Sequence, residues 1–116
     1  MANLANRARG DYGERRAAAW YAARGFQILA RNWRSGRSGE LDLVVQAGAV
    51  VVVCEVKARR TSDYGFAAEA VTASKQARIR RLAVEFLAAN GLHGVTLRFD
   101  VAAVTGTDIE VYEDVF

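Results

Sequence analysis

Residues 40–57 read ELDLVVQAGAVVVVCEVK, and this segment decides the fold because it has the pattern of a β-hairpin around Ala47-Gly48. Strand side chains alternate between two faces, and a short turn preserves that alternation across a hairpin. One face is wholly apolar and is expected to pack on a core: Leu41, Leu43, Val45, Val50, Val52, Cys54 and Val56. The other face carries Glu40, Asp42, Val44, Gln46, Val51, Val53, Glu55 and Lys57. Carboxylates and an ammonium thus gather at one end of a valine-lined face, which predicts a site.

The acidic and basic residues of this face have the chemistry of a hydrolytic metal site. Magnesium prefers oxygen ligands at about 2.0–2.1 Å and keeps several waters, and Asp42, Glu55 and the Val56 carbonyl could supply such ligands. Lys57 follows Glu55 by two strand residues, or roughly 6.6–6.8 Å. It would stand beside the ion, placed to position or deprotonate a metal-activated water. The alternative is a cross-strand ion pair of Glu40 or Asp42 with Lys57, worth only ~0.2–1 kcal/mol if exposed.

Lysine is rare in this chain, and both lysines fall at informative places. Of sixteen basic residues only Lys57 and Lys75 are lysines, and the rest are arginines. An ammonium differs from a guanidinium in being compact and able to lose its proton when its surroundings lower its pKa. Lys75 lies near the start of a helix expected to be capped by Thr72, four residues before the apolar Ile79. We therefore expect Lys75 to point at the same site as Lys57.

Length and composition predict one soluble, cytoplasmic domain over residues 1–116. The chain is long enough for one core, has no linker-like segment, and lacks an apolar run of the ~20 residues that span a membrane. Its single cysteine, Cys54, is expected to be a buried hydrophobe, and its single histidine, His93, a loop residue. These counts exclude a zinc cluster of cysteines and histidines.

Charge is distributed unevenly along the chain. Residues 1–60 hold eleven basic and five acidic residues, a net +6, whereas residues 61–116 hold five and eight, a net −3. Arginines flank the predicted site strands, and contact with a nucleic-acid backbone is the interpretation that we prefer for the cluster Arg31, Arg34, Arg37, Arg59 and Arg60. Each arginine alone has the alternative of a solvated surface role. Trp33 could stack on a base or be a buried aromatic.

The remaining pattern predicts the element order αβββαββ. Helices are expected over residues 8–24, ending at Gly25, and from Thr72 to about Asn90-Gly91, with an apolar stripe formed by Ile79, Leu82, Ala83, Phe86 and Leu87. Strands are expected over residues 26–33, 96–104 and 109–112 in addition to the hairpin, with a loop over 58–68. Glu14, in the first helix, is commonly a favourable N-terminal charge, and spacing alone does not settle its distance from the site.

Several short motifs together resemble the YraN family of small bacterial proteins. They are Gly13-Glu14, Arg31-Asn32-Trp33-Arg34, Gly39-Glu40-Leu41-Asp42-Leu43, Glu55-Val56-Lys57-Ala58-Arg59, Ala70-Val71 with Lys75, Arg98-Phe99-Asp100-Val101 and Phe116. That family is similar to the PD-(D/E)xK nucleases and to Holliday junction resolvases. The resemblance implies an α/β restriction-endonuclease-like core, a mixed central sheet flanked by helices. It also implies a Mg²⁺ or Mn²⁺ site formed by Glu14, Asp42, Glu55 and Lys57, although Leu41 stands where the motif's name has proline.

The resemblance implies a divalent-metal-dependent endonuclease that hydrolyses DNA phosphodiesters, with branched or junction DNA among the candidate substrates. Lys75 and Arg98 would then contact phosphates, and Glu40 and Asp100 are lesser candidates that could equally pair with nearby arginines. Two alternatives remain open from the sequence. One is a non-catalytic nucleic-acid-binding module with the nuclease fold, and the other is an interaction protein that self-associates through the valine-rich face. Resolvase-like proteins are commonly dimeric, so a homodimer fits either reading.

Overall fold

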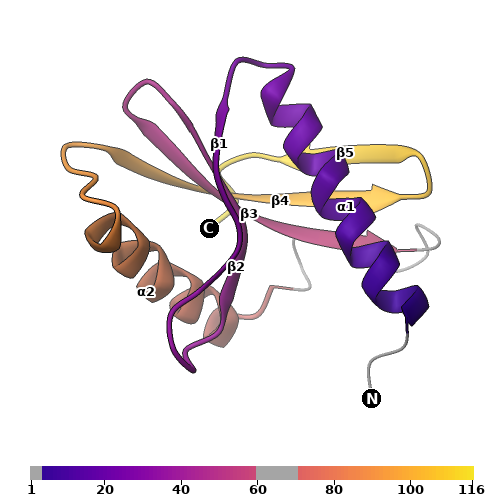
Figure 1. Cartoon of the computed structure of the whole chain (residues 1–116), viewed down its shortest axis with the longest axis horizontal. Coiled ribbons are helices and arrows are strands. Elements are labelled where there is room, and N and C mark those ends of the chain that lie inside the picture. The colour runs from indigo at the N-terminus through magenta and orange to yellow at the C-terminus, as the bar shows by residue number, and fades with distance from the viewer. Residues whose placement is uncertain (1–3, 60–70) are drawn as a thin grey trace.

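The computed structural model describes residues 4–59 and 71–116, with side chains described from Arg7 onward in the first helix. The elements follow the predicted order αβββαββ (Figure 1), and they are α1 (Leu4–Ala22), β1 (Gln27–Arg34), β2 (Glu40–Ala47), β3 (Val50–Arg59), α2 (Ala73–Ala89), β4 (Thr96–Thr105) and β5 (Asp108–Tyr112). α1 begins earlier than the predicted Ala8 and ends before Gly25, whose φ of 86° suits glycine. None of the helices in the described ranges is long and apolar enough to cross a membrane.

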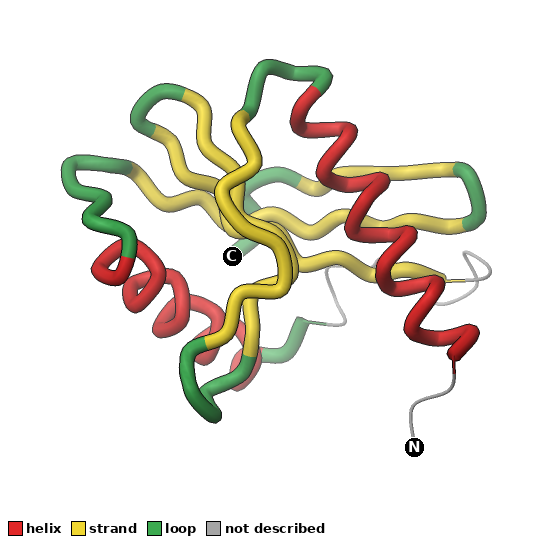
Figure 2. Tube along the Cα trace, in the orientation of Figure 1, coloured by secondary structure: helices red, strands yellow, loops and turns green. Residues whose placement is uncertain are grey.

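The five strands form one mixed sheet in the order β1-β2-β3-β4-β5. Neighbouring strands are antiparallel except β3 and β4, which pair in parallel from Val50↔Thr96 to Arg59↔Thr105. Parallel neighbours need a long crossover connection, and α2 lies within it. α1 and α2 lie on opposite sides of the sheet, so a mixed α/β architecture is confirmed (Figures 1 and 2).

The predicted hairpin forms, but its turn lies at Gly48-Ala49, one residue after the predicted Ala47-Gly48, with pairing from Leu43↔Cys54 to Ala47↔Val50. Gly48 has a φ of 57°, the conformation that a tight two-residue turn requires. Cys54 is fully buried, in agreement with its predicted role as a core residue.

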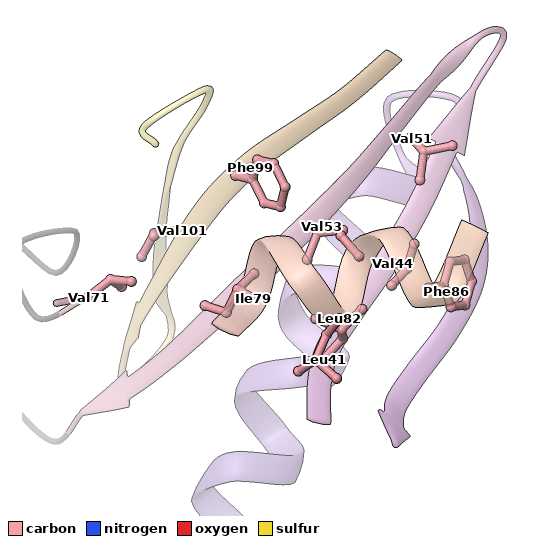
Figure 3. Packing of buried hydrophobic residues seen from close by; sticks show 11 residues of the cluster. Leu41, Val44, Val51, Val53, Val71, Ile79, Leu82, Phe86, Phe99 and Val101 are labelled. Carbon is pink, nitrogen blue, oxygen red and sulfur yellow. The ribbon is translucent and has the colours of Figure 1, made fainter. Parts of the chain in front are cut away.

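Two apolar cores lie on the two faces of the sheet. The core under α1 contains Ala17, Tyr21, Leu43, Val45, Val52, Cys54 and Ala102. The core under α2 is shown in Figure 3, and among its buried members are Leu41, Val44, Val51, Val53, Ile79, Leu82, Phe86, Phe99 and Val101. The buried residues of α2 are the predicted stripe, with Leu87 partly buried, and Thr72 caps the helix by accepting a hydrogen bond from the Lys75 N–H.

One sequence-based expectation about the hairpin faces is wrong. Leu41 packs in the core under α2, beside Leu82, instead of sharing a face with Leu43 (Figure 3). The regular pairing ends at Leu43↔Cys54, and beyond it the Asp42 carboxylate accepts the Val56 N–H at 2.9 Å, so strict alternation no longer constrains Leu41.

The valines of the other face, Val44, Val51 and Val53, are fully buried under α2. Their burial argues against the alternative of self-association through that face.

Candidate functional site

A pocket of about 410 Å³ lies where β2 begins and the second half of β3 meets the first turns of α2. Its lining combines acidic, basic and apolar groups: Gly39, Glu40, Asp42, Glu55, Val56, Lys57, Lys75, Arg78, Ile79 and Leu82. The structure therefore brings together the two hairpin carboxylates and both lysines that the sequence singled out. The turn between β1 and β2 lies beside α2 (Figure 2), and Gly39 keeps close to the Arg78 and Leu82 side chains there.

Asp42 is held by the backbone of the neighbouring strand. Its Oδ2 accepts the Val56 N–H at 2.9 Å, which orients the carboxylate at the end of the β2–β3 pairing. Burial raises the pKa of Asp42, while this hydrogen bond and the positive charges of Lys75 and Lys57 act in the opposite direction.

Glu55 is a buried carboxylate whose hydrogen-bonding capacity is only partly used, by the backbone N–H of Asp42, which lowers its pKa. Its side chain is 4% exposed, and its Oε1 lies 3.7 Å from the Lys75 Nζ, too long for a good hydrogen bond. Its Oε2 is buried and has no hydrogen-bond partner among the described residues. Burial, followed by the negative charge of Asp42, raises the pKa of Glu55 to about 7. A cation bound between the two carboxylates would stabilise this arrangement, because it would compensate their negative charge.

The two lysines of the chain are neighbours in the pocket. Burial, followed by hydrogen bonding and charge repulsion from the adjacent Lys75, lowers the pKa of Lys57 to about 8. An amine with this pKa is neutral in a minor fraction of molecules, about a tenth, at pH 7, and that fraction can accept a proton. Lys75 lines the pocket together with Ile79, at the end of the α2 stripe where it was predicted.

Glu14 lies near the pocket but does not line it. Its Oε1 accepts a hydrogen bond from the Asn32 Nδ2 at 3.0 Å, and Arg31 lies 3.9 Å away. Burial raises the pKa of Glu14, and the nearby charges of Asp42 and Glu40 raise it as well. Within residues 4–59 and 71–116, no three carboxylate, imidazole or thiol side chains form a group that could hold a metal ion. Asp42 and Glu55 therefore line the pocket together, and Glu14 lies outside its lining.

Most of the predicted phosphate-binding arginines lie outside the pocket. Arg34 pairs with Glu40 at 3.0 Å, Arg31 pairs with Asp11 at 3.1 Å, and Arg37 is exposed. Arg59 lines a neighbouring pocket, and Arg60 lies outside the described residues.

Arg98 lies on the α1 side of the sheet and is engaged by a carboxylate. Its Nε and Nη2 donate to Asp100 at 3.0 and 2.9 Å, which fixes the guanidinium away from the pocket. Asp100 is therefore the partner of an arginine outside the pocket, whereas Glu40 both pairs with Arg34 and lines the pocket. Trp33 packs edge-to-face on Phe86 with ring centroids 5.3 Å apart, in agreement with a buried aromatic.

Sequence reasoning missed two residues near this site. Arg78 lines the pocket and follows Lys75 by three residues, a spacing that places both on one face of a helix. Asn32, which fixes Glu14, has a φ of 53°, and no sequence pattern reveals that conformation.

Comparison with known proteins identifies the family. Residues 13–104 match the model of a family described as uncharacterised protein family UPF0102. The chain belongs to the UPF0102 family. The matched range includes Glu14 and every residue that lines the pocket.

Similar UPF0102 proteins occur in several bacteria. One from Rhodococcus jostii is 52% identical over 99 residues, covering 85% of this chain and 83% of its own length. Others are from Kineococcus radiotolerans, 52% identical over 97 residues and covering 83% and 79%, and from Symbiobacterium thermophilum, 50% identical over 95 residues and covering 82% and 80%.

Proposed function

We propose that this UPF0102 protein hydrolyses phosphodiester bonds of nucleic acid, with DNA as the preferred substrate, and that it needs Mg²⁺ or Mn²⁺. One observation carries the proposal: the buried carboxylate of Glu55, which has one oxygen without a hydrogen-bond partner among the described residues, shares a pocket with the half-buried Asp42 and with the only two lysines of the chain. Buried carboxylates that serve structure are normally satisfied by hydrogen bonds. A carboxylate left under-satisfied beside an amine of lowered pKa is typical of a catalytic site.

The donor set fits a hard divalent cation. Asp42 and Glu55 would hold the ion, because both offer carboxylate oxygens and both have raised pKa values that a nearby positive charge would lower. Glu14, which lies outside the lining of the pocket, would act as an outer ligand. Bound there, a divalent ion supplies charge stabilisation at the phosphate and lowers the pKa of a coordinated water.

The residues of the chain then have separate roles. Lys57 orients the attacking water and accepts its proton, because its lowered pKa makes a neutral amine accessible near pH 7. Lys75, 3.7 Å from Glu55, and Arg78 provide positive charge for the phosphate oxygens. Ile79 and Leu82 form an apolar wall that limits water access. The arrangement supports hydrolysis more readily than simple binding, since binding alone needs no buried carboxylates facing an anion.

The resemblance to PD-(D/E)xK nucleases supports the same activity. In those enzymes a strand aspartate and a following Glu-x-Lys carry the chemistry, and Asp42, Glu55 and Lys57 correspond by motif. The mixed sheet with a helix on each face is compatible with a restriction-endonuclease-like core. A homodimer of the resolvase type belongs to this proposal as well.

The decisive experiment is a cleavage assay on a panel of substrates. Purified protein is incubated with linear, nicked and four-way DNA and with RNA, in magnesium, in manganese and in chelator. We expect cleavage of at least one DNA substrate that requires metal and is lost in Asp42→Asn. Asp108→Asn is the matched control, because Asp108 is an exposed carboxylate outside the pocket.

Two results would contradict the proposal. Cleavage that survives chelator or Asp42→Asn would come from another enzyme in the preparation. Binding of nucleic acid with no cleavage of any substrate would favour the non-catalytic binding module.

A further inference from the structure

A second pocket, of about 430 Å³, lies next to the first at the end of β3 and the beginning of α1. Its lining residues are Arg9, Gly10, Val56, Lys57, Ala58 and Arg59. Val56 and Lys57 line both pockets, so the two are separated only by the end of this strand. A ligand in the second pocket would therefore lie beside a ligand in the first.

The two pockets differ in charge. The first contains the carboxylates Glu40, Asp42 and Glu55, whereas the part of the chain that the structure describes contributes no acidic residue to the lining of the second. Three of them, Arg9, Lys57 and Arg59, are cationic. A pocket with this lining suits an anion without the help of a metal ion, and arginine suits phosphate oxygens because its planar fork can donate two hydrogen bonds.

Gly10 indicates independently that this pocket is kept open. Glycine inside a helix costs about 0.5–1 kcal/mol relative to alanine, so a helical glycine usually has a packing reason. Gly13 has one, because a Cβ there would come within 2.9 Å of the Ala58 Cβ. Gly10 has none: a Cβ would meet no atom within 4 Å, and its φ is not positive. Since Gly10 lines the second pocket, its missing side chain leaves space for a ligand.

We propose that Arg9, Gly10, Lys57 and Arg59 form a subsite for the backbone phosphate next to the one that is hydrolysed. This inference rests on the proposed function of the first pocket and deepens it. The substrate is then a nucleic-acid strand with at least two consecutive phosphodiesters, and a mononucleotide ester is a poor substrate. Lys57 stands between the two phosphates and links substrate binding to the chemistry.

The test is binding of a fluorescently labelled oligothymidylate, followed by anisotropy in chelator. Without a divalent ion the carboxylates of the first pocket repel phosphate, so the second pocket dominates the affinity. We expect Arg9→Ala to weaken binding about tenfold, as for a lost charged hydrogen bond, and to reduce the slope of log affinity against log salt by about 0.7. Arg7→Ala is the matched control: it removes the same charge from an exposed position of the same helix that does not line the pocket.

Gly10→Leu provides a second variant that does not alter charge. Leucine favours helix and meets no atom at its Cβ, so the thermal midpoint should stay the same or rise, as in Gly10→Ala. Oligonucleotide affinity should fall because the side chain fills the pocket. Equal losses in Arg9→Ala and Arg7→Ala, or wild-type binding by Gly10→Leu, would overturn the subsite.

Two further arms separate the remaining possibilities. Inorganic phosphate that binds the wild type as tightly as the oligonucleotide does, with the same loss in Arg9→Ala, would make the pocket a free-phosphate site and overturn the backbone assignment. Asp42→Asn should retain Arg9-dependent binding in chelator. If the wild type shows Arg9-dependent binding but cleaves no substrate, the nuclease proposal fails and the subsite stands. If Arg9→Ala leaves cleavage unaffected, only the subsite is refuted.

Discussion

Glu55 and Asp100 are the two buried acidic residues of the described chain, and they lie on neighbouring strands but have opposite surroundings. Asp100 faces α1 and accepts hydrogen bonds from the Tyr21 hydroxyl, from two nitrogens of Arg98 and from the Asp114 N–H. Glu55 faces α2, has one long ion pair and leaves an oxygen without a partner. The same functional group is thus fully engaged on one face of the sheet and left available on the other.

This difference shows which carboxylate serves the fold. Asp100 connects α1, β4 and the C-terminal segment, so its negative charge is compensated within the protein. Glu55 and Asp42 are compensated only partly, by Lys75 and Lys57, and the pKa of each carboxyl is raised. Burying under-compensated charge costs stability, and such a cost is expected at a site that receives a ligand.

The largest effect is expected from Lys57→Arg. If Lys57 only paired with carboxylates, arginine would replace it with little loss. As the group that positions and deprotonates water, it should lose cleavage activity by about 10²–10⁴-fold, because a guanidinium stays protonated. Single-turnover rates in saturating magnesium measure this, and a rate within about threefold of wild type, or ~0.6 kcal/mol, would refute the catalytic role.

Asp100→Ala should cause the largest loss of stability. It leaves Arg98, the Tyr21 hydroxyl and the Asp114 N–H without their acceptor, and removing one partner of a buried pair costs about 3–5 kcal/mol. Urea denaturation followed by circular dichroism measures the free energy of unfolding. A loss no greater than that of an exposed control such as Asp108→Ala would mean that the two carboxylates do not differ as described.

Glu55→Gln and Asp42→Asn should act in the opposite way. Both should abolish manganese binding in calorimetric titrations, a loss of at least about tenfold in affinity, or ~1.4 kcal/mol. Neither should reduce the thermal midpoint without metal, because each removes one of two like charges in the pocket, and the charge of Asp42 raises the pKa of Glu55. Manganese binding that is undiminished in both variants would eliminate the proposed ion site.

Glu55 should also make the stability of the protein depend on pH. The pKa of Glu55 is raised from 4.5 to about 7 in the fold, so its stabilising contribution is complete below pH 4.5 and is lost as the pH rises through about 7. Each unit of difference corresponds to about 1.4 kcal/mol. Glu55→Gln has no such titration, and its free energy of unfolding relative to wild type should therefore increase over this range. A constant difference between pH 4 and 8 would mean that Glu55 titrates normally.

Much of the fold could be predicted because its signals are local. The hairpin has a two-residue periodicity and a glycine turn, and α2 has its cap at Thr72 and its buried stripe within one helix. Asp42, Glu55 and Lys57 follow from the same alternation, and Lys75 from its place on the stripe. The pairing of Arg98 with Asp100 was also accessible, because residues two apart on a strand share a face.

Other features depend on contacts that no local pattern encodes. Leu41 changes face because a side chain, the Asp42 carboxylate, replaces the backbone in bonding Val56. The position of Glu14 depends on how α1 crosses the sheet and on the unusual backbone of Asn32. The burial of the valine-rich face could not be predicted, because it depends on α1 and α2 covering opposite sides of the sheet.

The close packing of Gly13 against Ala58 predicts which substitutions a genetic selection would tolerate in α1. Because a Cβ at Gly13 would lie 2.9 Å from that of Ala58 and 3.3 Å from the Val56 Cγ1, any larger residue pushes α1 away from β3 and carries Glu14 with it. In a library screened first for folded protein and then for activity, Gly13 should be depleted in the first screen. Gly10, one turn earlier with open space around it, should pass the first screen and be depleted only in the second. Substitutions at Gly10 and Gly13, one turn apart in α1, would thus distinguish effects on folding from effects on substrate binding.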